Sequence, residues 1–409
     1  MSCDKIKIGF DAKRAVCNST GLGSYSRTLI NDIVRQSNQF GNVFAEENHP
    51  NADKRKAESE EQYSFYLYTP QKGEKQLVDQ IVTADNLQFV YPKYHNIKLL
   101  RDLWRERFIV NDLQKDGIDV FHALSGQLPK GIKAKGIKSV VTIHDLIFFP
   151  HPEFYNSIDV QLYKHKFFST IKEADKIIAI SECTKRDILK FGNMNKKTPF
   201  VSEDKIEVIY QSFNNIYSEP QTEEAKSRVK AKYSLPDRFI LNVGTVERRK
   251  NVLLAVKAVG ELPENIHLVI VGKRTSYTSE VEKYVEQNNL KERVHIFHNV
   301  DNQDLKVFYS LAEIFIYPSV YEGFGLPVTE AIANNLPVIA AKGSCLEEAG
   351  GESSYYVEPD NVEGMRSAIN MLLTNEDKRL IAIKEGQKYI RRFAGTDVAA
   401  KILDLYKSL

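Results

Sequence analysis

The stretch IFIYPSVYEGFGLPVTEAIANNLPVIAA (residues 314–341) indicates how this chain folds. Its apolar ends, IFIYPS (314–319) and PVIAA (337–341), predict strands, and PVTEAIANN (327–335) between them predicts a helix. A strand, a helix and a second strand in this order form the βαβ unit of a parallel sheet. The loop YEGFGLP (321–327) then follows the carboxyl end of the first strand, where open α/β sheets bind ligands.

The same alternation of short apolar runs and helix-length segments continues in both directions and predicts an α/β protein. Strands are expected at 6–12, 64–69, 87–91, 119–123, 139–145, 176–181 and 205–210, and then at 239–244, 267–272, 294–300, 314–319 and 337–341. The polar, proline-containing segment 212–238 separates the two series. We therefore expect two Rossmann-like domains with a boundary near residue 216, and a polar loop at 46–62.

The composition excludes several classes of protein. With 409 residues, 42% of them hydrophobic, the chain can bury two cores of ordinary size. A net charge of +2 gives no basic field of the kind that attracts nucleic acid. Cys3, Cys17, Cys183 and Cys345 contain no CxxC pair, which favours a reducing compartment over a zinc site or a disulfide scaffold. No signal core or membrane span is apparent, so we expect a cytoplasmic protein, or one peripheral to a membrane.

The loop 321–327 has the chemistry of a phosphate and sugar site. Gly323 and Gly325 lack Cβ atoms, so their amides can approach an anionic or sugar ligand, and the following helix contributes the positive end of its dipole. Glu330, about one turn into the helix, can accept hydrogen bonds from a diol such as a ribose. Glu322, in the loop, can meet a second polyol. The alternative for Glu330 is that it only complements the helix dipole.

Three further loops follow strands at the same predicted sheet edge. A basic turn after Gly244 contains Arg248, Arg249 and Lys250, which could neutralise phosphate charge, although a solvated basic turn would look the same. The other two loops contain Gly272-Lys273-Arg274 and Asn299-Val300. Four strand ends are therefore expected around one crevice.

These stretches resemble a known family. GTVERRKN (244–251), LVIVGK (268–273), the segment 294–341 and EPDNVEGMRSAINMLL (358–373) are similar to the donor domain of retaining, GT-B-fold glycosyltransferases of family 4, the glycosyl transferases group 1. The N-terminal half resembles mannosyltransferase-like members of the family in the stretches FDAKRAVCNSTGLGSYSRTLI (10–30), DVFHALSGQLP (119–129), TIHDLIFFPHPEFY (142–155) and IIAISECTKRDI (177–188). The likeness covers essentially the whole chain.

The resemblance implies a fold and a division of labour between domains. It implies a GT-B architecture, in which two Rossmann-like domains with parallel sheets face each other across a deep cleft. An N-terminal domain (1–215) would hold the acceptor, a C-terminal domain (216–392) would hold a nucleotide-diphospho-sugar donor, and a helix at about 393–409 would pack back on the N-terminal domain.

Site residues follow from the resemblance position by position. The implied catalytic residues are His144, Arg249, Lys250 and Glu322, of which Lys250 matches the diphosphate-binding lysine and Glu322 faces the donor sugar. The implied donor-binding residues are Gly21, Gly23, Gly244, Arg248, Gly272, Lys273, Val300, Gly323, Phe324, Gly325, Leu326 and Glu330. Gly21-Leu22-Gly23 is expected as a glycine-rich loop before a helix. Thr245 stands where many members carry an arginine, so either Arg248 or Arg249 would supply that charge.

The implied activity is retaining transfer of a hexose to a glycan or lipid-linked saccharide in surface polysaccharide biosynthesis, with mannose from GDP-mannose as first choice. A UDP-sugar donor is the alternative, and a non-catalytic nucleotide-sugar-binding subunit is an alternative of another class. A dinucleotide-dependent oxidoreductase is disfavoured because no GxGxxG follows the first strand. We expect no cofactor and no metal, since no DxD-type element is present and two cations could replace a divalent ion.

The segment KYHNIKLLRDLWRERF (93–108) combines basic and apolar residues at helical spacing. Such a pattern occurs in helices that lie on anionic membranes. A buried structural face has the same spacing, and it is the preferred interpretation.

Overall fold

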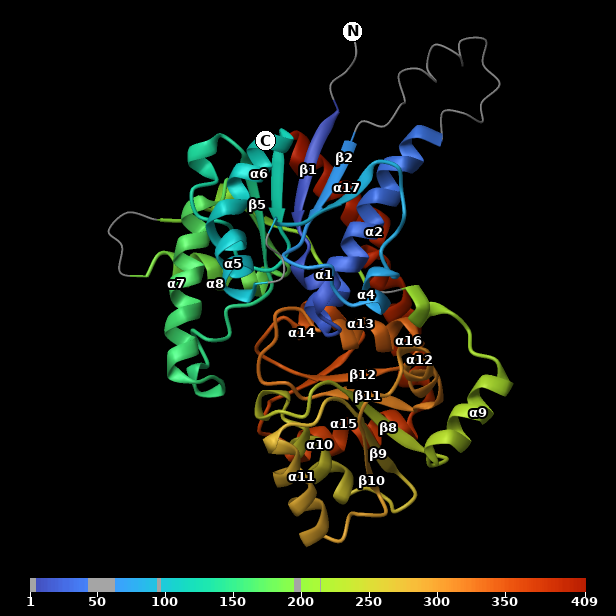
Figure 1. Cartoon of the computed structure of the whole chain (residues 1–409). Helices are drawn as coiled ribbons and strands as arrows, with labels where there is room; N and C mark the ends of the chain where they lie inside the picture. The colour runs from blue at the N-terminus through green and yellow to red at the C-terminus, as the bar shows by residue number, and fades with distance from the viewer. Residues whose placement is uncertain (1–4, 43–62, 94–96, 195–199, 214) are drawn as a thin grey trace. The chain divides into compact units, whose positions relative to one another are not determined.

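A computed structural model describes residues 5–42, 63–93, 97–194, 200–213 and 215–409 (Figure 1). The chain divides into two compact units, one made of Met1–Ser212 with Phe393–Leu409 and the other of Phe213–Arg392. The polar loop expected at 46–62 lies outside the described residues. Cys17, Cys183 and Cys345, the cysteines within the described part, are thiols.

The first unit is built on a parallel sheet of seven strands in the order β3-β2-β1-β4-β5-β6-β7. The strands are β1 (Ile6–Asp11), β2 (Tyr63–Tyr68), β3 (Leu87–Val90), β4 (Val120–Ala123), β5 (Lys138–Ile143), β6 (Lys176–Ala179) and β7 (Ile206–Val208). The helices are α1 (Lys13–Cys17), α2 (Gly21–Asn42), α4 (Lys75–Val78), α5 (Lys98–Leu103), α6 (Ile109–Asp116), α7 (Ser157–Glu173), α8 (Glu182–Gly192) and α17 (Gly395–Lys407).

Alternate residues of these strands serve two cores, one on each face of the sheet. Val120, Val140 and Ile178 point into a core that α2 and α17 cover. Their neighbours in sequence, among them Phe121 and Val141, point into a second core with residues of α6, α7 and α8. The strands are apolar on both faces because the sheet is covered on both, as parallel sheets usually are.

The C-terminal helix α17 belongs to the first unit and lies beside α2 (Figure 1). Gly395 opens it, and a Cβ at that position would lie 2.4 Å from Oδ2 of Asp32 on α2, so only glycine fits there without a shift. Further along, the hydroxyl of Tyr406 lies 2.6 Å from Nδ1 of the buried His122 on β4. The end of the chain is thus packed into the first core.

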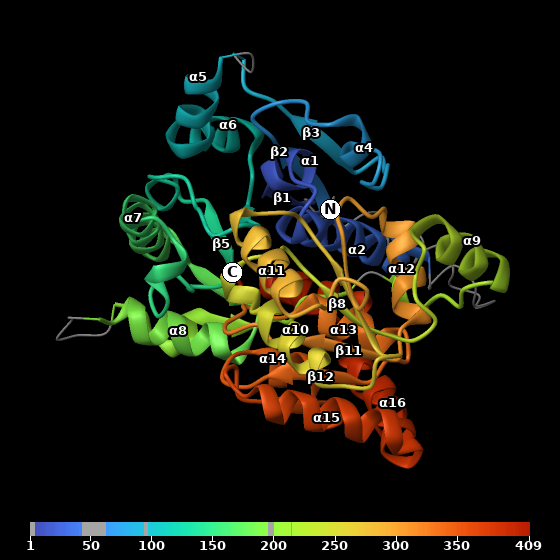
Figure 2. The ribbon, with the colours of Figure 1, turned by 90° about the horizontal axis from the view of Figure 1, so that it is seen from below.

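The second unit has a parallel sheet of six strands in the order β10-β9-β8-β11-β12-β13. The strands are β8 (Phe239–Val243), β9 (His267–Val271), β10 (Val294–Phe297), β11 (Ile314–Tyr317), β12 (Val338–Ala341) and β13 (Tyr355–Val357). The helices are α9 (Glu223–Tyr233), α10 (Val252–Gly260), α11 (Ser276–Gln287), α12 (Asn302–Leu311), α13 (Leu326–Ala333), α14 (Leu346–Gly350), α15 (Val362–Thr374) and α16 (Glu376–Tyr389). Figure 2 shows α9 beside α12, and α15 beside α16.

The α/β fold with two parallel sheets is confirmed, and all twelve expected strands are present within a few residues of their predicted ends. The thirteenth strand, β13 (Tyr355–Val357), was not predicted. It has only three residues and follows SS rather than a long apolar run, so no periodic signal marks it.

The interpretation of residues 93–108 as a buried structural face is wrong for most of the described part. Trp104 is buried and donates to Oδ2 of Asp112 at 2.6 Å. Exposed apolar side chains surround it in sequence: Ile97, Leu99, Leu100, Leu103 and Phe108. The α-helix Lys98–Leu103 has no buried residue, and a π-helical turn at Trp104–Phe108 interrupts the α-helical spacing after it. In the described ranges, no helix is long and apolar enough to cross a membrane.

Candidate functional site

The second sheet reverses its strand order between β8 and β11, which pair as neighbours. Ligands of open α/β sheets bind outside the carboxyl ends of the strands at such a switch point. The two loops that leave this point are residues 244–251 after β8 and 318–325 after β11, and they contain the basic turn and the first predicted glutamate.

The loop after β8 is shaped by its backbone. Gly244 has φ of 154°, and Arg248–Lys250 form a 3-10 turn that ends at Asn251 in the left-handed region, with φ of 52°. The Asn251 amide donates to the carbonyls of Pro318 at 3.2 Å and Pro359 at 2.7 Å. This amide therefore fixes the basic turn against the loop that follows β11.

Glu322 and the basic turn form one buried ionic network. Oε1 of Glu322, a residue that is 8% exposed, accepts hydrogen bonds of 2.5 Å from both Nζ of Lys250 and Oγ of Ser319. Oε2 lies 3.0 Å from Nη1 of Arg249. Lys250 also donates to the hydroxyl of Tyr317 at 2.6 Å. The two predicted phosphate-binding cations and one predicted sugar-facing carboxylate thus meet directly.

Arg249 is held more firmly than an ordinary loop arginine. Its Nη1 donates to the carbonyl of Tyr321 at 2.7 Å, and its Nη2 to Oε1 of Glu247 at 2.7 Å. The backbone pairs as well, because Val320 donates to the Arg249 carbonyl at 2.8 Å. Such a fixed guanidinium can present its remaining N–H groups to an anion in a defined direction.

The network determines the charge state of Glu322. Burial alone would raise the pKa of this carboxyl, but Lys250, Arg249 and the hydrogen bonds from Lys250 and Ser319 lower the pKa to about 2. Burial opposes the charge on Arg249, yet Glu322 and Glu247 outweigh it and raise the pKa of that guanidinium. Glu322 and Arg249 are therefore both charged at neutral pH.

Glu330 is in the opposite situation. It lies on α13 and accepts a hydrogen bond of 3.0 Å from the hydroxyl of Tyr309. Within the described residues, no lysine, arginine or histidine forms a hydrogen bond or an ion pair with its carboxylate. Burial raises the pKa of Glu330 to about 7, and the Tyr309 hydrogen bond lowers it only in part. A carboxyl group of this kind changes its charge near neutral pH.

A row of three aromatic rings connects the contacts of Glu330 with those of Lys250. The ring centroids of Tyr309 and Phe315 are 5.5 Å apart, and those of Phe315 and Tyr317 are 5.9 Å apart. Glu330 contacts one end of this row and Lys250 the other. Both predicted site residues therefore lie on the same side of the second sheet.

Gly325 and Phe324 shape the start of α13. Gly325 caps the helix with φ of 104°, and a Cβ there would lie 2.7 Å from Cδ2 of Leu346. Phe324 is buried, and Gly323 precedes it in the loop. Leu326 is the first residue of the helix. The glycine thus permits both the turn and the close approach of α14.

The remaining predicted donor-binding residues differ in their surroundings. A Cβ on Gly272 would lie 1.7 Å from the Gly244 carbonyl oxygen, so the ends of β9 and β8 approach at backbone distance. Lys273 is exposed and Val300 half-buried. Arg248 is directed away from the Glu322 network: its side chain is 68% exposed, pairs with Glu280 on α11 at 2.6 Å and lies over the Tyr277 ring.

The first unit places His144 at the end of β5 with both ring nitrogens engaged. Nε2 lies 2.9 Å from the Leu124 carbonyl and therefore donates, while Nδ1 accepts from the Gln211 amide at 2.8 Å. Burial lowers the pKa of His144, the hydrogen bond to the Leu124 carbonyl raises it, and the charge of Arg14 lowers it. Together these effects bring the pKa to about 4. His144 is thus a neutral imidazole in one tautomer.

The expectation of a glycine-rich loop at Gly21-Leu22-Gly23 is wrong in its secondary structure. Both glycines lie in the first turn of α2, and the short helix α1 stands between them and β1. A Cβ on Gly23 would lie 1.7 Å from the Asn18 carbonyl oxygen. The glycine is needed because the helix begins against the preceding backbone.

Several residues of the site were not predicted: Tyr317, Ser319, Glu247 and Tyr309, with Gln211 in the first unit. Ser319 lies within the quoted stretch, where a hydroxyl three residues before Glu322 was a usable signal. Tyr309 and Gln211 reach their partners through long-range contacts that no local pattern reveals.

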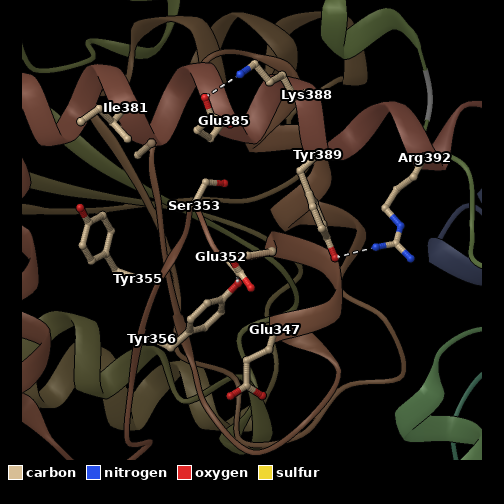
Figure 3. A pocket seen from close by; sticks show the side chains of 12 residues that line it. Glu347, Glu352, Ser353, Tyr355, Tyr356, Ile381, Glu385, Lys388, Tyr389 and Arg392 are labelled. Carbon is tan, nitrogen blue, oxygen red and sulfur yellow. Dashed lines mark hydrogen bonds and ion pairs between the residues drawn. The ribbon is translucent and has the colours of Figure 1, made fainter.

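The second unit also contains a pocket of about 890 Å³ between α14, β13 and α16 (Figure 3). None of the predicted site residues lines it. Its basic side chains are engaged, since Lys388 pairs with Glu385 at 2.8 Å and Arg392 donates to the Tyr389 hydroxyl at 3.3 Å. The chemistry of the predicted site is therefore elsewhere. Among the described residues, no group of three or more His, Cys, Asp or Glu side chains could hold a metal ion.

Two family models match the chain, one over each series of strands. Residues 223–389 match "Glycosyl transferases group 1" and residues 59–214 match "Glycosyltransferase Family 4". O-antigen chain mannosyltransferase B of Escherichia coli is 25% identical over 295 residues, which are 71% of this chain and 74% of that protein. O-antigen chain mannosyltransferase RfbU of Salmonella typhimurium is 29% identical over 253 residues, which are 62% of this chain and 65% of that protein.

Solved structures agree on the fold. A sucrose-phosphate synthase from Thermosynechococcus elongatus superposes with a TM-score of 0.73 at 19% identity over 99% of both chains. Anabaena Alr3699/HepE, solved in complex with UDP and glucose, superposes with a TM-score of 0.70 at 15% identity over 99% of this chain and 100% of that chain. This chain belongs to the GT-B-fold glycosyltransferases of family 4, the glycosyl transferases group 1.

Proposed function

We propose that the protein transfers mannose, with retention, from GDP-mannose to a saccharide acceptor in surface polysaccharide biosynthesis. The observation that carries the proposal is the network of Lys250, Arg249 and Glu322 at the switch point of the second sheet. The choice of mannose rests on relatives that are named O-antigen mannosyltransferases.

In this proposal the basic turn binds the donor diphosphate. The bond between the sugar C1 and the phosphate oxygen breaks with its electron pair leaving on the diphosphate, and a new bond forms from the acceptor hydroxyl oxygen to C1. The acceptor proton passes to the departing phosphate oxygen, so no protein base is required. Lys250 and Arg249 stabilise the charge that develops on the diphosphate. Glu330 holds the ribose hydroxyls of the nucleotide.

Glu322 has two functions in the proposal. It positions the Lys250 ammonium and the Arg249 guanidinium before the donor arrives, and it faces the donor sugar with its carboxylate. Because its pKa is about 2, it is ionised whenever the enzyme works near neutral pH. His144 contacts the transferred sugar as a neutral imidazole and transfers no proton in the reaction, because both of its ring nitrogens are already hydrogen-bonded.

We also propose that transfer requires no metal ion, because two fixed cations can neutralise the leaving diphosphate. Transfer should proceed undiminished after treatment with EDTA. Activity that disappears with EDTA and returns only with added Mg²⁺ or Mn²⁺ would refute metal independence.

A UDP-sugar donor is the second candidate, and the structural likeness to a protein solved with UDP and glucose favours keeping it in the test. A panel of GDP-, UDP- and ADP-sugars should be assayed for donor hydrolysis and for transfer. Release of GDP from GDP-mannose at the highest rate supports the first choice. Donor binding without hydrolysis or transfer would identify a nucleotide-sugar-binding subunit. A rise in the thermal unfolding temperature with NAD, but with none of the nucleotide sugars, would exclude a glycosyltransferase.

We propose a cytoplasmic location, peripheral at the inner face of the membrane, with a glycan or lipid-linked acceptor. Support for membrane contact comes from the exposed apolar side chains of Leu99, Leu103 and Phe108 beside the exposed Arg107. Sedimentation of the protein with anionic vesicles but not with neutral ones would support this location. Absence of sedimentation with either kind of vesicle would contradict it.

A further inference from the structure

The first unit contains a pocket of about 330 Å³ that the proposed chemistry uses only in part. Its lining comes from the segments that follow β1, β4 and β5, together with α7: Arg14, Gln127, His144, Asp145, Tyr163 and Lys166 are among its residues. The first sheet reverses its strand order between β1 and β4. The pocket therefore lies at the edge where open α/β sheets bind ligands.

Two cations of this pocket are without a partner. Within the described residues, the side chains of Arg14 and Lys166 make neither a hydrogen bond nor an ion pair. Two other cations that act on Lys166 are paired: Arg105 lies 2.5 Å from Asp11, and Lys13 lies 3.5 Å from Asp102. The chain thus neutralises the neighbouring positive charges and leaves these two for something else.

The charge on Lys166 is held at an energetic cost. The side chain is half-buried, and burial lowers the pKa of its ammonium group. Arg105, Lys13 and Arg14 lower it further by repulsion, while Glu106 opposes them. The pocket also contains one carboxylate, Asp145, whose Oδ1 accepts from the Ile147 amide at 3.3 Å. An anionic ligand would relieve the repulsion between the cations.

The wall beside the cations is aromatic. The Tyr163 ring centroid lies 5.6 Å from that of Phe148 and 6.0 Å from that of Tyr155, and all three side chains line the pocket. Gln127 is fixed by Arg105, which donates to its Oε1 at 3.2 Å. Aromatic faces and fixed polar groups together suit a sugar ring, which has both apolar and hydroxylated surfaces.

We propose that this pocket binds the acceptor through a phosphate group, which Arg14 and Lys166 hold while the aromatic wall contacts the attached sugar. The inference deepens the proposed function, on which it rests, by naming the chemical class of the acceptor: a saccharide phosphate. A phosphate has enough oxygens for the fork of an arginine and the point charge of a lysine at once. The same phosphate could belong to a free sugar phosphate or to a lipid-linked saccharide.

The test is binding of matched sugars to the full-length protein, measured by calorimetry with GDP and UDP present in excess so that the donor phosphate site is filled. The probes are the 1-phosphates and the neutral methyl glycosides of glucose, galactose and mannose, and glucuronate as a carboxylate control. At least one 1-phosphate should bind about tenfold more tightly than its methyl glycoside. Lys166→Gln and Arg14→Gln should each lower that affinity by about tenfold, and Lys166→Arg should restore most of it.

Lys172→Gln is the matched control, because Lys172 is exposed on the same helix and does not line the pocket. Equal affinities for charged and neutral sugars, preference for glucuronate, or an equal loss in Lys172→Gln would overturn the proposal. Failure of the donor proposal is separate, since it would appear as absent binding of GDP and UDP themselves. A second binding measurement distinguishes a lipid-linked acceptor from a free sugar phosphate, by using the same saccharide phosphate attached to a lipid in neutral vesicles. Tighter binding of the lipid-attached form than of the free form supports a lipid-linked acceptor, and equal or weaker binding supports a free one.

Discussion

The Lys250 ammonium lies 2.5 Å from Oε1 of Glu322, a carboxylate 72 positions further along the chain. Both side chains are nearly buried, with exposures of 14% and 10%. A buried ion pair is often no more stabilising than a well-packed apolar pair, since removing two charges from water offsets most of their attraction, although loss of one partner alone is costly. Its value here is position, because the pair holds a lysine at the switch point where a diphosphate is proposed to bind.

Replacement of Lys250 by methionine should lower kcat at saturating donor by a factor on the order of 10²–10³, because one donor to the departing phosphate is lost. The methionine keeps an unbranched side chain but removes the Nζ that lies 5.0 Å from the Tyr317 ring centroid. Lys283→Met is the control, since Lys283 is exposed on α11. Unchanged turnover in Lys250→Met would remove this lysine from the mechanism.

The two adjacent arginines should respond differently to the same change. Arg249 is 16% exposed and bound to Glu322, Glu247 and the Tyr321 carbonyl, whereas Arg248 is 68% exposed and pairs with Glu280. Arg249→Met should lower kcat/KM at least about tenfold. Arg248→Met should remain close to the wild type, because exposed ion pairs contribute little. Equal losses in steady-state assays would show that both reach the donor.

This distinction between the arginines could not be made from the sequence. The order of strands and helices could, because apolar periodicity and glycine-containing strand ends are local signals. The Lys250–Glu322 contact depends on which strands become neighbours, and nothing in either segment specifies that β8 pairs with β11. A short strand such as β13 and a π-helical turn at Trp104–Phe108 leave no periodic trace, so both were missed.

Glu322→Gln should reduce stability at neutral pH, because Lys250 and Arg249 lose a buried counter-charge. The Glu322 pKa is about 2 in the folded protein, below its ordinary value of 4.5. Its contribution, about 3 kcal/mol, is therefore present above pH 4.5 and is lost as the pH falls toward 2. Urea unfolding followed by circular dichroism should show the two proteins converging in that window. A constant difference from neutral pH down to acid would contradict the assigned pKa.

Glu330 should make donor affinity dependent on pH. Its pKa is raised to about 7, so the carboxylate that accepts ribose hydrogen bonds becomes available as the pH rises through that value. The Kd for the nucleotide should fall by up to about tenfold between about pH 6 and about pH 8. Glu330→Gln should flatten the profile. Tyr309→Phe should move its midpoint to higher pH, because the Tyr309 hydrogen bond lowers the pKa of Glu330.

The raised pKa of Glu330 also makes the stability of the fold depend on pH. A carboxyl group with a raised pKa binds more protons in the folded protein than in the unfolded one between pH 4.5 and about 7. Stability therefore declines with rising pH in this window, and Glu330→Gln should remove that decline. A donor Kd that stays flat across the range in the wild type would show that the carboxylate does not meet the ribose.

His144 should remain a neutral imidazole protonated at Nε2 down to acidic pH. The Leu124 carbonyl accepts from Nε2, the Gln211 amide donates to Nδ1, and burial lowers the pKa to about 4. Nitrogen-15 chemical shifts of the labelled ring should show one tautomer, and Gln211→Leu should introduce the second. A titration midpoint near 6.5 would contradict the neutral role assigned to this histidine.

The most direct measurement is isothermal calorimetry of GDP, UDP and the parent nucleosides with the wild type, Lys250→Met and Lys283→Met. The account predicts that at least one diphosphate binds to the wild type and to Lys283→Met far more tightly than its nucleoside, and that Lys250→Met loses this preference. Diphosphate binding of wild-type strength in a folded Lys250→Met protein would contradict the placement of the donor phosphates at the basic turn.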